Sequence, residues 1–325
     1  MRRQVLALDP ARYAPHRLHG ADRNWTETNC WLDMMVEVLH VLGYEPLAAA
    51  AGTLSADFDG EQWPLFKFAT EDLRALFGIE IDEMYVWRPV LDHIEDHLGM
   101  GQLVTVEVDA WFLPDTAGIT YGTDHAKTGV VVQMVDRDER RLGYFHNAGY
   151  FELQGDDFDG IFHRPGGRDP RILLPYMELV RLDRRRHDPP GVVLDRARAL
   201  TVAHLARRPA DNPVVRLGAR MESDLAWVAA GGDAAFHPYA FATCRQVGAT
   251  AELAAAFVEW LDAGDGGGLE KAAAAFGSMA ERAKGLQFSL ARAGRGRRVD
   301  LGGQVAEMAE AWETAMAVMV ARYGS

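Results

Sequence analysis

Apolar residues recur at helical spacing over residues 31–42, which is the strongest local pattern in the first half of the chain. Thr28 or Asn29 suits the N-cap position of such a helix, and Gly43 suits its C-terminal end. The pattern therefore predicts a mostly buried helix with Cys30 in its first turn.

The rest of the first half changes from helical to alternating patterns. Three shorter helices are predicted over residues 48–51, 70–77 and 89–98. Strands are predicted over residues 103–108, 130–135, 142–145 and 150–153. The run at 130–135 is almost continuously apolar, which is typical of a central strand.

The second half is rich in alanine and helical in period. Helices are predicted at roughly residues 192–207, 213–230, 245–262, 268–293 and 301–322, and the glycines of 264–268 look like a linker. We therefore expect an α+β protein, with a helix packed on an antiparallel sheet in a first domain at 1–165 and a helical domain at 166–325.

Composition narrows the class of protein. Of the 325 residues, 48% are hydrophobic and 25% charged, which is typical of a globular chain, and the net charge is −13. An acidic chain is a poor match for nucleic acid as its main partner. No apolar stretch is long enough to be a signal peptide or to span a membrane, and two cysteines make no disulfide framework, so a cytoplasmic protein is expected.

Thiol catalysis needs a thiolate, a base that forms it and a group that orients the base. Unpaired N–H groups and the macrodipole stabilise negative charge at a helix start, so the predicted place of Cys30 suits a nucleophile. A helix-opening cysteine followed by Trp31 resembles the papain-like layout, although the flanking glycines of that layout are absent.

The papain-like resemblance implies roles for further residues. Its base lies at the start of a downstream strand, where His125 leads into the apolar run. Its third member lies at the far end of the return strand, where Asn147 would accept from the imidazole. The backbone N–H of Cys30 is one oxyanion donor; Asn24 matches the side-chain donor by spacing, with Asn29 as a rival.

Several residues have plainer interpretations. His146 is a competing second base or a substrate contact, and strand alternation puts it on the face opposite Asn147. His93 and His97 have a spacing that can bind zinc, but a solvated helix face is favoured and no metal is expected. Cys244 is predicted to be a core thiol.

A longer set of segments carries a family resemblance, found at residues 27–33, 57–62, 66–68, 106–109, 113–117, 125–128 and 143–152. Together they resemble an uncharacterised bacterial family whose members are often encoded beside amino acid:carrier-protein ligases and small carrier proteins. That family is distantly similar to the butirosin-type acyltransferases, papain-like enzymes that move an acyl group from a carrier-protein thioester to an amine.

The resemblance implies acyl or aminoacyl transfer from a phosphopantetheine thioester, with the phosphopantetheine supplied by the carrier protein and no cofactor bound. The acceptor would be a small molecule bearing an amine or hydroxyl group. Substrate contacts are expected from Asp109, Asp115 and Tyr121 on the loop before His125. Carrier proteins are usually acidic, so docking is expected at basic clusters, namely Arg184, Arg185, Arg186, Arg295, Arg297 and Arg298.

Three functions stay open from the sequence. The first is a cysteine acyltransferase with an acyl-Cys30 intermediate. The second is a thiol hydrolase of the same fold, such as a thioesterase, peptidase or amidase. The third is a non-catalytic protein that binds the carrier protein.

Overall fold

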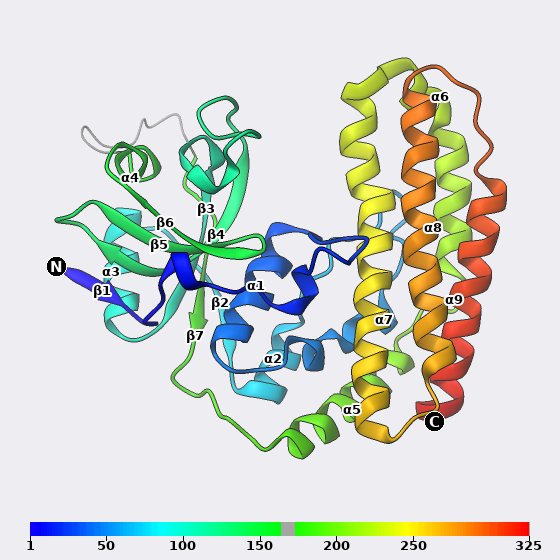
Figure 1. The fold of residues 1–325 in the computed structure, drawn as a ribbon, viewed down its shortest axis with the longest axis horizontal. Helices are drawn as coiled ribbons and strands as arrows, with labels where there is room; N and C mark the ends of the chain where they lie inside the picture. The colour runs from blue at the N-terminus through cyan, green and yellow to red at the C-terminus, as the bar shows by residue number, and fades with distance from the viewer. Residues whose placement is uncertain (164–172, 325) are drawn as a thin grey trace. The chain divides into compact units, whose positions relative to one another are not determined.

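A computed structural model describes residues 1–163 and 173–324 (Figure 1). The expected domain boundary between residues 165 and 166 lies outside the described residues. The chain divides into two compact units. The sheet unit comprises residues 1–20, 29–44 and 73–187, and the helical unit comprises residues 21–28, 45–72 and 188–325.

The sheet unit is built around one antiparallel sheet in which β2, β7, β3, β4, β5 and β6 lie in that order and β1 adds to β4. The strands are β1 Arg2–Gln4, β2 Glu80–Met84, β3 Leu103–Asp109, β4 Lys127–Asp136, β5 Arg141–His146, β6 Gly149–Gln154 and β7 Met177–Arg181. The apolar run expected to be a central strand is β4, whose residues 130–135 are all buried. The sheet extends beyond the expected boundary, because β7 pairs with both β2 and β3.

Helices cover both faces of this sheet. α1 (Cys30–Val41) packs on β4 and β5, with Met34 beside Gly129. The residue after Gly129, Val130, belongs to the apolar core on the other face, together with residues of α3 (Val90–Gly99) and α4 (Asp156–Ile161). Successive strand residues point to opposite faces, so α1 lies opposite α3 and α4.

The start and end of α1 follow the sequence pattern. The Asn29 side chain accepts a hydrogen bond from the backbone N–H of Leu32 at 3.1 Å, which is N-cap geometry. Past the helix end, Gly43 has φ of +79°, and the Tyr44 N–H returns to the Leu39 carbonyl at 2.9 Å. These caps fix Cys30 as the first helical residue.

The helical unit consists mainly of helices. Four long ones lie side by side in Figure 1, namely α6 Pro213–Ala240, α7 Gln246–Asp265, α8 Glu270–Gly294 and α9 Gly302–Tyr323. The helix α5 Pro190–Ala206 precedes them, and a π-helical turn, Phe241–Arg245, joins α6 to α7. A 3-10 helix, η3 (Pro46–Ser55), packs on α5 and α7; it stands where a short helix at 48–51 was predicted. No helix in the described part of the chain is long and apolar enough to cross a membrane.

Short elements complete the fold. The helix α2 (Thr70–Phe77) has the predicted bounds. Four 3-10 turns are η1 Pro10–Arg12, η2 Arg17–His19, η4 Ala110–Phe112 and η5 Pro114–Thr116. The antiparallel α+β half and the mainly helical second half are thus confirmed.

Candidate functional site

Cys30 lies partly exposed at the start of α1, over the sheet. A Cβ built on Gly129 of β4 would lie 3.8 Å from its sulfur, an ordinary contact distance, so the thiol lies over this position of the strand. Next to the cysteine, the Trp31 indole N–H donates to buried Glu178 of β7 at 2.8 Å. This hydrogen bond ties the first turn of the helix to the sheet.

His125 lies just before β4 and is held on two sides. Its Nδ1 lies 2.6 Å from Oδ2 of Asp109, and its ring stacks on Trp111 with centroids 4.4 Å apart and planes at 12°. Asp109 is fixed in turn by accepting from the Trp111 backbone N–H at 3.0 Å. A carboxylate only accepts hydrogen bonds, so the pair places the proton on Nδ1 and leaves Nε2 as an acceptor.

Cys30 and His125 approach the same face at the same end of β4. Positions 125, 127 and 129 share one face by alternation, and pairing continues outside the strand where the Ala110 N–H donates to the Ala126 carbonyl at 2.8 Å. Gly129 follows His125 by four residues, or about 13 Å of extended chain. Among the described residues, no hydrogen bond joins the Cys30 thiol to a histidine, so the two groups are neighbours along the strand rather than a closed pair.

The expected third member lies elsewhere. Asn147 sits in the turn between β5 and β6 with φ of +44°, a conformation that asparagine tolerates well. The partner of the His125 ring is Asp109. The orienting role predicted for the Asn147 amide thus falls to the carboxylate of Asp109, which was predicted to contact substrate.

His146 is buried and fully engaged. Its Nδ1 lies 2.6 Å from Asp115 and its Nε2 lies 2.9 Å from the Thr128 hydroxyl. The Tyr144 hydroxyl donates to the other Asp115 oxygen at 2.6 Å, and burial and Asp115 raise the pKa of Tyr144. His146 and Asp115, both predicted as substrate contacts, thus anchor the loop before β4 to β5.

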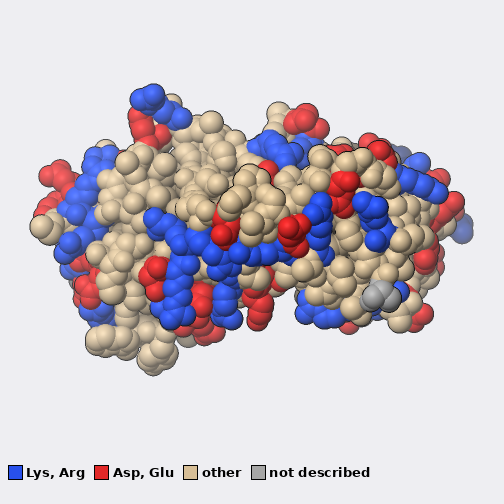
Figure 2. Space-filling view, turned by 90° about the horizontal axis from the view of Figure 1, so that it is seen from below, with Lys and Arg blue, Asp and Glu red and all other residues tan. Residues whose placement is uncertain are grey.

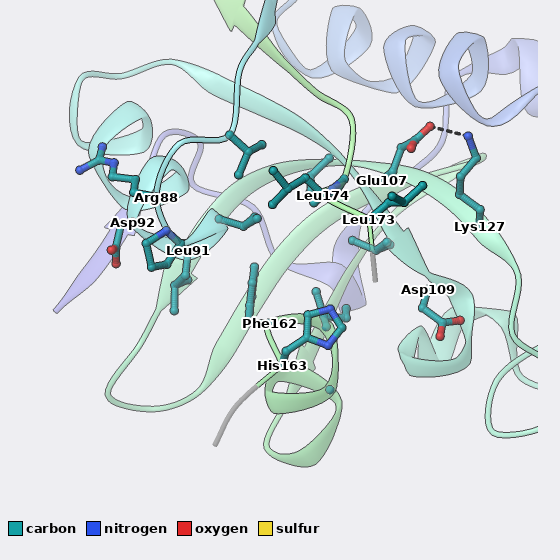
Figure 3. Close-up of a pocket in the computed structure, with 18 of the residues that line it drawn as sticks. Arg88, Leu91, Asp92, Glu107, Asp109, Lys127, Phe162, His163, Leu173 and Leu174 are labelled. Atoms are coloured by element: carbon teal, nitrogen blue, oxygen red, sulfur yellow. Dashed lines mark hydrogen bonds and ion pairs between the residues drawn. The ribbon is translucent and has the colours of Figure 1, made fainter. Parts of the chain in front are cut away.

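A cavity of about 1210 Å³ opens beside His125. Figure 3 shows Glu107, Lys127 and Asp109 on one side of it and Arg88 and Asp92 on the other, with apolar side chains between them. Lys127 donates to Glu107 at 2.7 Å. The apolar wall includes Leu91, Val106, Val108, Ile161, Phe162, Leu173 and Leu174. An apolar ligand bound there would reach the imidazole of His125 at the rim.

The remaining predicted site residues lie as follows. The backbone of Asn24 is bound within the helical unit, with its N–H donating to Glu252 at 2.8 Å and its carbonyl accepting from Lys284 at 3.0 Å. The oxygen of Asn29 is used as the helix cap. The Tyr121 hydroxyl donates to Asp157 at 3.1 Å, which raises the pKa of Tyr121.

Basic side chains gather on part of the face shown in Figure 2, although the chain is acidic. Arg184 lies 3.7 Å from Glu80, and Arg186 donates to the Arg74 carbonyl at 3.1 Å, so these two contribute to the fold. The side chains of the other predicted docking residues are exposed: Arg185, Arg295, Arg297 and Arg298.

Two parts of the site were missed from the sequence. Trp111 supports the His125 ring. It follows Asp109 by two residues, and residues two apart in an extended chain share a face, so this spacing could have indicated that both contact His125. The cavity joins residues of six separate segments and left no such signal. Among the described residues, no three His, Cys, Asp or Glu side chains gather as a metal would require.

Comparison with known families matches two adjacent models, the DUF1839 N-terminal domain over residues 14–182 and the DUF1839 C-terminal domain over residues 192–321. No curated protein matches the chain significantly.

Proposed function

The chain belongs to the DUF1839 family, and we propose that it is a cysteine-dependent acyltransferase with a papain-like catalytic unit. The observation that carries the proposal is the Asp109–His125 pair at 2.6 Å, which lies at the end of β4 over which the Cys30 thiol also lies, beside Gly129. A nucleophile at a helix start and an oriented base are parts that acyl transfer through a thiol needs, and an apolar cavity lies beside the base.

The reaction has two halves. The Cys30 sulfur attacks the carbonyl carbon of a carrier-protein thioester after losing its proton to Nε2 of His125. The C–S bond to phosphopantetheine then breaks, and the leaving thiol takes the proton back from His125. In the second half, His125 accepts a proton from an amine or hydroxyl acceptor, whose nitrogen or oxygen attacks the acyl-Cys30 carbonyl and releases the thiol.

The ring of His125 has to approach the sulfur for this chemistry. The His125 side chain is 67% exposed, and the Asp109 carboxylate and the stacked ring of Trp111 hold it in its present position, so these three side chains would have to move together. Catalytic hydrogen bonds in enzymes without substrate often tighten only in the reactive complex. The apolar cavity beside the ring, on the α3 and α4 side of the sheet, would hold the apolar part of the acyl group or the acceptor. Two acidic residues that line it are already paired, Glu107 with Lys127 and Asp109 with His125.

Intact-mass measurement after mixing with an acyl-loaded carrier protein tests the proposal. The expected result is an acyl adduct on the wild-type chain and none on Cys30→Ala. Cys244→Ala is the matched control: Cys244 is fully buried, burial raises its pKa to about 12, and its loss should leave the adduct unchanged.

The same experiment separates the other functions. An adduct that persists in Cys30→Ala would remove Cys30 as the nucleophile. Rapid loss of the adduct to water without an acceptor would assign a hydrolase instead of a transferase. A carrier protein that binds without leaving any adduct would assign the non-catalytic function.

A further inference from the structure

A second set of catalytic side-chain types meets in the helical unit, away from the residues used above. The Ser55 hydroxyl lies 2.8 Å from Nδ1 of His204, and Nε2 of His204 lies 2.8 Å from Oδ2 of Asp72. Ser55 ends the 3-10 helix η3 and His204 belongs to α5. Both distances are within hydrogen-bond reach, as nucleophile–base and base–acid pairs require.

The carboxylate fixes the state of the imidazole. Asp72 only accepts, so Nε2 of His204 carries the ring proton, and Nδ1 presents its lone pair to the Ser55 hydroxyl and to the more distant Nη2 of Arg207. His204 and Asp72 are both buried, which limits the positions that the ring can adopt. The Ser55 hydroxyl has a second acceptor, the Gly52 carbonyl at 3.1 Å, but the histidine nitrogen is the closer of the two.

This set opens onto a cavity of about 530 Å³, which Ser55 and His204 both line. One wall is apolar and consists of Trp63, Pro64, Leu65 and Phe66. Arg207 also lines the cavity, and its Nη2 lies 3.1 Å from Nδ1 of His204, next to the serine hydroxyl. A guanidinium there is placed to stabilise negative charge that develops on a carbonyl oxygen or to bind an anionic group.

We propose that Ser55, His204 and Asp72 form a serine-hydrolase site for carboxylic esters that combine an apolar part with a negative charge. Ser55 Oγ bonds to the ester carbonyl carbon while its proton passes to Nδ1 of His204. The C–O bond to the alcohol breaks, and the alcohol leaves with that proton. Water then attacks the acyl-serine, loses its proton to His204, and releases the acid and the serine hydroxyl.

Labelling by a fluorophosphonate, which reacts with activated serines, tests the site in a Cys30→Ala chain, so that the first site cannot contribute. We expect one adduct, located by peptide mass on Ser55. It should be absent in Ser55→Ala and form about 10²–10⁴-fold more slowly in His204→Gln. Ser289→Ala is the control, because Ser289 only bonds Gln304 at 3.1 Å and its loss should change nothing.

Substrate preference gives a readout that a structural role would not move. Hydrolysis of the mono-p-nitrophenyl ester of succinate should exceed that of neutral p-nitrophenyl acetate. Arg207→Gln should raise KM for the anionic ester and leave KM for the neutral one unchanged. No adduct on wild-type Ser55 at saturating probe, or an adduct that survives Ser55→Ala, would overturn the proposal and leave Ser55 as the hydroxyl that caps the end of η3.

Discussion

At the scale of single residues, two histidine–carboxylate pairs of the sheet unit differ in exposure rather than in geometry. His125 lies 2.6 Å from Asp109, and His146 lies 2.6 Å from Asp115. The His125 side chain is 67% exposed, whereas that of His146 is 3% exposed and bonds Thr128 through its second nitrogen. Only the first of these two pairs leaves a ring nitrogen for a substrate, which is why the proposed base is His125.

Replacing the carboxylate of that pair tests the role of Asp109. In Asp109→Asn the amide can donate to the ring and favour the wrong tautomer, so adduct formation at Cys30 should slow by about 10²–10⁴-fold. Intact-mass measurement of the acyl adduct in samples quenched at successive times gives the rate. Asp124→Asn is the matched control, since Asp124 is the exposed neighbour of His125 and should change the rate less than about 2-fold. Equal rates in Asp109→Asn and wild type would exclude Asp109 as the orienting group.

At the scale of elements, α1 is held by a buried polar cluster. His19 contacts Asp33 at 3.5 Å and hydrogen-bonds Glu37, both on α1, and the Tyr13 hydroxyl also donates to Glu37. Burial lowers the pKa of His19, but its hydrogen bonds to Asp33 and Glu37 outweigh burial and raise that pKa to about 9. The cluster therefore binds a proton that the unfolded chain releases at lower pH.

This shift predicts the pH dependence of stability. The folded-state pKa lies above the ordinary value of 6.5, so the contribution of His19 is complete below pH 6.5 and is lost as pH rises through about 9. It amounts to up to about 3 kcal/mol of unfolding free energy. Urea unfolding across this range should show the loss in wild type and a flatter profile in His19→Gln. The exposed His237→Gln should keep the wild-type slope; identical slopes in all three chains would contradict the assignment.

In the helical unit, the ring of Trp25 lies close to the backbone of α7, and this contact gives a second prediction at the scale of elements. A Cβ on Gly248 of α7 would lie 2.5 Å from the ring of Trp25, which is buried and donates to the Ala280 carbonyl at 3.1 Å. Gly248→Ala should therefore lower the unfolding free energy by about 1–3 kcal/mol. Gly277→Ala on α8 meets nothing within 4 Å and should raise it by about 0.5–1 kcal/mol through helix propensity. Chemical unfolding of both variants checks the opposite signs.

The elements also show how far the sequence could lead. The residues of α1 were predictable because apolar spacing and the Asn29 cap agreed, and α2 has Glu71 and Asp72 in its first turn, which suits a helix start. The edge strand β2, with sequence EIDEM, has only two apolar residues and was missed. The strand β7 was missed because two of its five residues, Glu178 and Arg181, are charged. The local pattern thus predicted where α1 and β4 begin. Identifying Asp109 as the partner of His125 required the register between β3 and β4, which the local pattern does not contain.

At the scale of the whole molecule, the two units are interleaved in sequence. The chain contributes residues 21–28 and 45–72 to the helical unit before the sheet unit is complete. Nothing in the composition of these segments marks them, because their partners are buried apolar residues more than a hundred positions away, such as those of α5 and α7 against η3. The expected boundary at residues 165 and 166 follows the change to alanine-rich sequence. It therefore could not show that residues 21–28 and 45–72 belong to the helical unit.

Charge is the other property of the whole chain, and it bears on the proposed carrier protein. A net charge of −13 repels an acidic partner at long range, so encounter depends on local basic clusters. Arg297 and Arg298 are exposed on the loop between α8 and α9, whereas Arg184 is partly neutralised by Glu80 at 3.7 Å. The loop between α8 and α9 is therefore the better candidate for docking.

Two charge-matched double variants test this choice. Arg297→Glu with Arg298→Glu should weaken binding of the acyl-loaded carrier protein about 10-fold at low salt, mainly through a slower association rate. Arg184→Glu with Arg185→Glu changes the net charge equally and should have a smaller effect. Since the Debye length falls to about 3 Å at 1 M salt, the difference between the variants should shrink as salt rises. Equal losses in both variants would show that net charge alone governs the encounter, and that neither cluster is a docking site.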